Sequence, residues 1–124
     1  MSAAWTATEL DSIARSEEIH IAGERADGSL HAWTPIWVVR SDRDLYIRSG
    51  FGAKSDWYRH IADGRAHIRF ADAEYPVVLE LHSDPTLADM IDDAYRDKYR
   101  HSSFLPTLIS KDARSTTSLI LPRR

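Results

Sequence analysis

The 124-residue sequence carries 16 basic and 19 acidic side chains, a net charge of -3, and 43% hydrophobic residues. This balance predicts one globular domain over residues 1–124 and gives no general positive field for nucleic acid. Cysteine is absent, which excludes disulfides, thiolate nucleophiles and cysteine-ligated metals.

Membrane and metal sites are not predicted either. Glu9, Asp11 and Arg15 interrupt the apolar residues near the start of the sequence, so we expect no secretory signal and no membrane span. The cytoplasm is therefore the expected compartment. The six histidines show no close ligand spacing, and no P-loop, dinucleotide fingerprint or nucleophile elbow is present.

The first predicted elements are a short helix and a β-hairpin. Residues 8–14 have the pattern of an amphipathic helix, with Thr8 as the N-cap. Residues 19–22 are strand-like, a turn with Asp-Gly at its centre follows at 25–29, and residues 30–34 return as the second strand.

The next two strands lead to the most informative part of the sequence. A nearly continuous apolar run over 36–40 is typical of a strand that is buried on both faces, as in a barrel. A turn at 42–44 leads into a strand over 45–49. Because alternate side chains of a strand point to opposite faces, Arg48 is expected to face away from Leu45.

The loop after this strand combines glycines with polar and charged residues. Gly50 and Gly52 allow close approach of a ligand to the backbone, and Lys54 lies at the far end of the loop. Ser55 fits the N-cap of a short helix predicted over 56–63. The guanidinium before the loop, the ammonium, the hydroxyl and the free helix N–H groups would then surround one anion, such as a phosphate.

The same residues also fit an ordinary loop. Arg48 and Lys54 can be solvated charges, and the glycines can simply turn the chain. Trp57 and Ile61, at i, i+4 spacing, can belong to the core. The residues alone leave both interpretations open.

The second half of the sequence predicts a further hairpin, a long helix and a last strand. Residues 66–70 and 75–81 alternate as two strands joined by a turn, and residues 85–100 have the spacing of an amphipathic helix. Residues 104–111 are expected to be irregular, and residues 116–121 to form the last strand.

The polar face of the long helix is expected to be solvated surface, because a charged stripe opposite an apolar one is the usual pattern of such helices. Its members are Asp89, Asp92, Asp93, Arg96 and Asp97. The predicted elements together indicate a mainly β, α+β fold, a small antiparallel barrel of six or seven strands with about three helices.

Several short motifs resemble the flavin-binding split-barrel superfamily. They are the Thr-Pro pair at 34–35 followed by a strand, the run 44–49, and Lys54 with the Trp-Tyr pair at 57–58. The likeness covers about residues 19–99. Within the superfamily, the sequence most resembles the uncharacterised branch called domain of unknown function 2255, and it has a further likeness to deazaflavin-dependent nitroreductases.

The resemblance implies a split β-barrel, usually a homodimer, which holds FMN or a deazaflavin coenzyme at the subunit interface. The residues that it places beside the ring system are Thr34, Pro35 and Ile36. Those that it places at the phosphate are Arg48, Ser49, Lys54 and Ser55. Trp57 and Tyr58 would form a wall of the pocket.

Two functions follow from this resemblance. The first is an oxidoreductase in which the bound flavin or deazaflavin passes a hydride to a small-molecule acceptor; Tyr58 or His60 could donate a proton, although His60 also fits a helix-surface position. The second is a non-catalytic dimeric module that binds a small planar or phosphorylated ligand. In that case Trp33, Trp37 and Trp57 belong mainly to the core and the interface.

Overall fold

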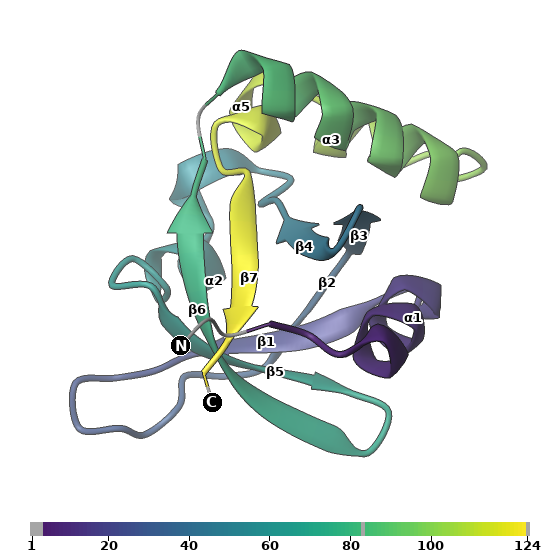
Figure 1. The fold of residues 1–124 in the computed structure, drawn as a ribbon. Helices are drawn as coiled ribbons and strands as arrows, with labels where there is room; N and C mark the ends of the chain where they lie inside the picture. The colour runs from purple at the N-terminus through teal and green to yellow at the C-terminus, as the bar shows by residue number, and fades with distance from the viewer. Residues whose placement is uncertain (1–3, 83, 124) are drawn as a thin grey trace.

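In residues 4–82 and 84–123, one antiparallel sheet of seven strands forms the body of the protein (Figure 1). The computed structural model describes residues 4–82 and 84–123. The strands in this part of the chain are β1 Ile19–Gly23, β2 Thr34–Ile36, β3 Val38–Ser41, β4 Asp44–Ile47, β5 Arg65–Phe70, β6 Ala73–Leu81 and β7 Ser118–Pro122. Their order in the sheet is β2-β1-β5-β6-β7-β4-β3.

The two edge strands of this sheet are joined by a single residue. β2 and β3 stand at opposite ends of the strand order, yet only Trp37 separates them along the chain. The sheet must therefore curl until its edges meet, which gives a nearly closed barrel with a split beside Trp37. The predicted antiparallel split barrel with helices is confirmed.

Helices accompany the sheet at several points. Residues 4–82 and 84–123 contain α1 Ala7–Arg15, the 3-10 helix η1 Gly52–Lys54, α2 Asp56–Arg59, α3 Pro85–Lys98, α4 Leu105–Leu108 and α5 Lys111–Arg114. The predicted long helix is confirmed as α3, which begins at Asp84 as N-cap and packs on β3 (Figure 1). The helix expected over 56–63 stops after one turn, and the segment expected to be irregular at 104–111 contains α4.

Helix α1 begins two residues earlier than expected. Thr6, and not Thr8, is its N-cap: the Thr6 hydroxyl oxygen accepts the Glu9 N–H at 3.1 Å, and the Glu9 carboxylate accepts the Thr6 N–H at 2.9 Å. This reciprocal pair is a capping box. Thr8 was the wrong choice because only Thr6 has a glutamate three residues later.

Alternate residues of the strands separate into two cores. Leu45 and Ile47 belong to the core inside the barrel, whereas Val39 and Tyr46 belong to a second core under α3. The alternation predicted for the strand at 45–49 is therefore confirmed. Arg48 follows β4 on the α3 side, where its guanidinium lies over the Tyr95 ring.

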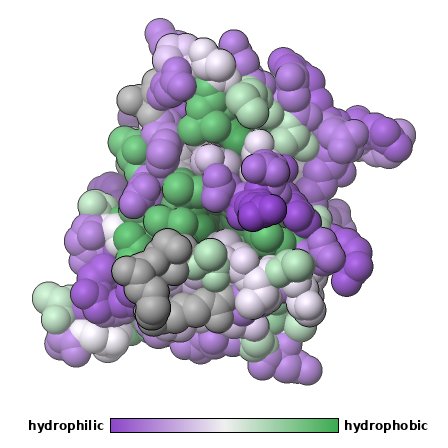
Figure 2. Space-filling view, in the orientation of Figure 1, coloured by the Kyte–Doolittle hydropathy of each residue, from purple (hydrophilic) through white to green (hydrophobic). Residues whose placement is uncertain are grey.

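Hydrophilic and hydrophobic residues occupy different parts of the face shown in Figure 2. On the face shown in Figure 2, hydrophilic residues cover the periphery and hydrophobic residues gather towards the middle. In the described part of the chain, every helix is too short or too polar to cross a bilayer.

Candidate functional site

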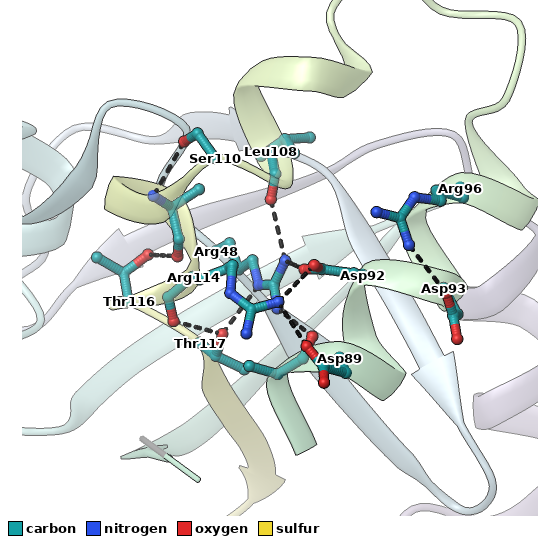
Figure 3. A network of polar contacts seen from close by, with 12 residues as sticks. Arg48, Asp89, Asp92, Asp93, Arg96, Leu108, Ser110, Arg114, Thr116 and Thr117 are labelled. Atoms are coloured by element: carbon teal, nitrogen blue, oxygen red, sulfur yellow. Dashed lines mark hydrogen bonds and ion pairs between the residues drawn. The ribbon is translucent and has the colours of Figure 1, made fainter. Parts of the chain in front are cut away.

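The Arg48 side chain, expected to meet a phosphate, is buried and bound to protein groups. Only 2% of the residue's surface is exposed. Nε donates to the Thr117 hydroxyl at 2.9 Å, and Nη2 donates to the Ala88 carbonyl at 2.9 Å. Nη1 donates to Asp92 Oδ1 at 2.5 Å and to the Leu108 carbonyl at 3.1 Å (Figure 3). The guanidinium thus ties the end of β4 to α3, to α4 and to the residue that precedes β7.

Asp92 joins two arginines in the same network. Its Oδ1 accepts from Arg48 and its Oδ2 accepts from Arg114, which also pairs with Asp89 at 3.0 Å (Figure 3). Hydrogen bonds to Asp92 and then to Asp89 raise the pKa of Arg114. Because two guanidinium groups compensate its charge, Asp92 can be buried, at 6% exposure. The expectation of a fully solvated acidic face on α3 is wrong at this residue.

Ser49 and Ser55 bond to each other across the glycine loop. Ser49 Oγ donates to Ser55 Oγ at 2.8 Å, and the Ser49 N–H donates to the Thr116 hydroxyl oxygen at 2.8 Å. Ser55 occupies the N-cap position of α2, but its side chain makes no capping hydrogen bond. The predicted N-cap position of Ser55 is confirmed, but its hydroxyl bonds to Ser49 and makes no capping hydrogen bond.

Lys54 lies apart from Arg48's network. It ends the 3-10 helix Gly52–Lys54, and the residue is exposed. Since Arg48 is bound to Asp92 and Lys54 is exposed, the described residues do not form the expected site in which these two cations meet one anion.

A cavity of about 340 Å³ opens beside Arg48 at the split of the barrel. Most of the residues expected at a cofactor site line it: Thr34, Pro35, Ile36, Arg48, Ser55 and Trp57. Its other lining residues are Glu18, Trp37, Gly50, Phe51, Phe104 and Leu108. Ser49, Lys54 and Tyr58 are outside this described lining. The structure therefore brings the expected ring-binding residues together, but some of the residues expected to bind the phosphate lie outside the cavity lining.

Three aromatic residues that were not expected at the site shape this cavity. Trp37 stacks on Tyr99, with ring centroids 4.0 Å apart and planes 6° from parallel. Phe104 meets Trp37 edge-on at 5.8 Å and Phe51 at 6.0 Å. These contacts fix the orientation of the Trp37 ring. A signal for Phe51 was present in the sequence, because it stands between two glycines, where a large apolar side chain has few neighbours to cover it.

The polar groups of the cavity do not favour an anion. Glu18 contributes a carboxylate, Thr34 and Ser55 contribute hydroxyls, and Asp92 balances the charge of Arg48. An uncharged planar ring that carries N–H and C=O groups fits this lining better than a phosphate does.

The two side chains considered as proton donors lie elsewhere. Tyr58 lines a separate cavity of about 270 Å³ together with Leu79 and Ser118, and burial raises the pKa of its hydroxyl. His60 stacks on His31, with ring centroids 3.7 Å apart and planes 7° from parallel. Neither belongs to the described lining of the cavity at the split.

The same fold occurs in solved structures of low sequence identity. A conserved hypothetical protein from Mycobacterium tuberculosis superposes with a TM-score of 0.71 at 16% identity, over 99% of this chain and 84% of that chain. An FAD-binding protein from Mesorhizobium loti gives 0.60 at 19% identity, over 97% and 91% of the two chains. An F420 reductase gives 0.59 at 18% identity, over 92% of each chain. At these identities the likeness shows the fold alone.

Sequence comparison adds the family. A search of curated proteins finds no match. Residues 9–120, which are most of the chain, match the family model described as "Uncharacterized protein conserved in bacteria (DUF2255)". The expected resemblance is thereby confirmed, and the chain belongs to the DUF2255 family, with the fold of the flavin-binding split barrels.

Proposed function

We propose that the cavity at the split holds the ring system of FMN or of a deazaflavin coenzyme, and that the protein is a flavin- or deazaflavin-dependent oxidoreductase. The observation that carries the proposal is the aromatic cavity itself, which is lined by Thr34, Pro35, Ile36 and Trp57. The resemblance to flavin-binding split barrels associates the first three residues with the ring and Trp57 with the wall of the pocket. The FAD-binding protein and the F420 reductase that share this fold support the same class of ligand.

The size of the cavity suits a planar ring rather than a whole cofactor. About 340 Å³ lies near the lower end of ligand pockets, which span roughly 300–1,000 Å³. Trp37 is held in place by its stack on Tyr99, and Trp57 supplies a second indole. Aromatic rings of this kind bury a large apolar area and favour offset or edge-on contact with another ring. Their part is to orient the ligand's ring and to exclude water from it.

The polar residues of the lining can form hydrogen bonds to the edge of such a ring. The Glu18 carboxylate can accept a hydrogen bond from a ring N–H, and the hydroxyls of Thr34 and Ser55 can donate to ring carbonyl oxygens. A flavin or deazaflavin, when bound, supplies the hydride chemistry toward a small-molecule acceptor. The chain's contribution is binding and orientation, and none of the cavity's side chains is assigned a catalytic proton.

The phosphate is assigned to the outside of the cavity. Lys54 is exposed just beyond the glycine loop, whereas Arg48 has its donors directed at protein groups. We therefore assign phosphate binding to Lys54 and a structural role to Arg48.

A homodimer is the assembly that this surface supports. Phe51 is 70% exposed and Phe104 is 43% exposed, and both line the cavity. Two exposed phenylalanines at one cavity are costly in water and favour cover by another protein surface. A second copy of the chain, placed as in the dimers implied by the family resemblance, would cover the rings and enclose the ligand.

Fluorescence titration of the purified protein with riboflavin, FMN and the deazaflavin coenzyme tests the ring site. We expect quenching of the ligand's fluorescence with micromolar affinity, and at least a tenfold loss of affinity in Trp57→Leu. Trp33→Leu is the matched control, because Trp33 lies outside the described cavity lining and stacks under Arg69. Absence of quenching with all three ligands, or equal losses in the two variants, would overturn the proposal.

The phosphate assignment has its own test. Lys54→Met should weaken FMN binding about tenfold and leave riboflavin binding unchanged, because one charge-assisted hydrogen bond contributes roughly 1.5 kcal/mol and riboflavin lacks the phosphate. Lys111→Met, which removes another exposed lysine, is the control. If Arg48→Lys lowered the ratio of FMN affinity to riboflavin affinity and Lys54→Met left this ratio unchanged, Arg48 and not Lys54 would bind the phosphate.

The alternative is a non-catalytic dimeric module that binds a small planar ligand in the same cavity. It is favoured by the lining, whose carboxylate, hydroxyls and apolar side chains can bind a planar ligand without taking part in a reaction. Oxidation of the reduced, protein-bound cofactor by candidate acceptors distinguishes the two. A rate no greater than that of the free cofactor supports the module.

A further inference from the structure

A second cavity, of about 630 Å³, lies between the ends of α1 and α3. Tyr99 is in its wall, and Tyr99 is also the residue on which Trp37 of the first cavity stacks. The lining residues are Ala14, Arg15, Glu17, Lys98, Tyr99, His101, Ser102 and Ser103. None of them belongs to the described lining of the proposed flavin site.

Lys98 is the residue that distinguishes this cavity. It is half-buried, its Nζ donates to the Val38 carbonyl at 2.6 Å, and Nζ lies 5.2 Å from the centroid of the Tyr99 ring. Among the described residues, no carboxylate lies within ion-pair distance of this ammonium. The amine is thus partly removed from water and anchored by a neutral acceptor, which is the setting in which lysines act as nucleophiles.

Burial lowers the pKa of Lys98 to about 8. At pH 7.5 roughly a quarter of an amine with this pKa is neutral, against about one in a thousand for an ordinary lysine. The neutral amine can keep its hydrogen bond to the Val38 carbonyl and still present a lone pair.

One arginine of the cavity around Lys98 can bind an anionic reactant. Arg15 at the end of α1 and His101 after α3 line the cavity, and Glu17 is the one carboxylate in its described lining. Arg40 and Asp97 line, together with Lys98, a separate cavity of about 240 Å³. The Arg15 guanidinium therefore offers a permanent positive charge to the anionic end of a small molecule in this cavity.

We propose that Lys98 is an acylation site and that the cavity around it admits a small acyl phosphate as the acyl donor. The neutral amine attacks the acyl carbon, a C–N bond forms, and the C–O bond to phosphate breaks. Phosphate leaves with the bonding electron pair, and the amine's proton passes to solvent. The amide N–H that results can still donate to the Val38 carbonyl, so the modification requires no rearrangement of β3.

The chain provides its own controls for the test, because its other lysines, Lys54 and Lys111, are both exposed. The protein is incubated with acetyl phosphate at pH 7.5, digested at acidic residues, and acetylation of each lysine is followed by mass spectrometry. We expect Lys98 to react at least tenfold faster than the other two, and the three rates to converge in denaturing urea. A Lys98 rate equal to or below the others in the folded protein would overturn the proposal.

Two further measurements separate the amine from the cavity. The Lys98 rate should level off above about pH 8, whereas the rates at Lys54 and Lys111 should still rise; a common pH profile would overturn the assigned nucleophile. Arg15→Gln should slow acetylation of Lys98 by acetyl phosphate several-fold and leave its reaction with the neutral ester p-nitrophenyl acetate unchanged. Equal rates with acetyl phosphate in the variant and the wild type would overturn the acyl phosphate as donor.

Discussion

Replacing Arg48 by methionine tests whether this arginine stabilises the fold. The side chain is fully buried, and its four hydrogen bonds link the end of β4 to α3, to α4 and to Thr117 before β7. Methionine retains much of the stem but removes the charge and every donor. Asp92 then keeps only Arg114 as a partner, and the Leu108 carbonyl loses a donor.

The expected loss is large for one substitution. Removing one partner of a buried ion pair costs about 3–5 kcal/mol, because the other charge stays buried without full compensation. Since Asp92 retains Arg114, the lower end applies, about 3 kcal/mol. For a domain of this size, each kcal/mol corresponds to roughly 3–5 °C in Tm, so Tm should fall by about 10–15 °C.

Urea and thermal unfolding, followed by circular dichroism, measure this loss. Arg96→Met is the matched control, because Arg96 also pairs with an aspartate of α3, Asp93 at 2.9 Å, but both side chains are more than half exposed (Figure 3). Exposed pairs contribute about 0–1 kcal/mol, so Tm should change by only a few degrees. A loss below about 1 kcal/mol in Arg48→Met, or equal losses in the two variants, would refute the structural role.

Three other substitutions have defined outcomes. Thr6→Ala removes the capping box of α1 and should lower the free energy of unfolding by about 1 kcal/mol in urea titrations, whereas Thr8→Ala should have little effect; the reverse order would restore Thr8 as the cap. Gly23→Ala would place a Cβ 2.3 Å from the His60 carbonyl oxygen and should cost about 1–3 kcal/mol, so a neutral result contradicts the close packing at this position. The pKa of His31 is lowered mainly by burial and secondly by the neighbouring His60. The His31 imidazole is therefore protonated at a higher pH in the unfolded chain than in the folded chain. Wild-type stability should therefore decline as the pH falls through about 6.5 towards the folded pKa, and His31→Gln should reduce that decline; identical profiles in urea unfolding at pH 8 and 5.5 would contradict the assignment.

Patterns between near neighbours in the sequence predicted much of the fold. Alternation over 45–49 predicted that Leu45 and Ile47 share one face of the strand and Tyr46 the other, because a strand has a fixed period of two. The long helix was predicted from its apolar spacing. These features depend on residues within a few positions of one another, so the sequence carries a local signal for them.

Features set by distant partners were predicted less well. The run 36–40 was expected to be one strand, but the chain changes from one sheet edge to the other at Trp37. A continuous apolar run contains no residue pattern that indicates where such a change occurs. Arg48 was assigned to a phosphate because no local pattern links it to its acceptor, Asp92, which lies 44 positions further along the chain. The short helix α4 and its neighbour Phe104 also gave no periodic signal, since one turn is too short to show one.

Strand β7 is the last strand in chain order but lies inside the sheet, between β6 and β4. Until residues 118–122 leave the ribosome, the hairpin of β3 and β4 has no sheet partner linking it to β6, and the nascent chain holds two unjoined β-segments with open edges. Translation must therefore finish this strand before the barrel can close, so the exposed edges of the unfinished chain are where a ribosome-associated chaperone would be most useful.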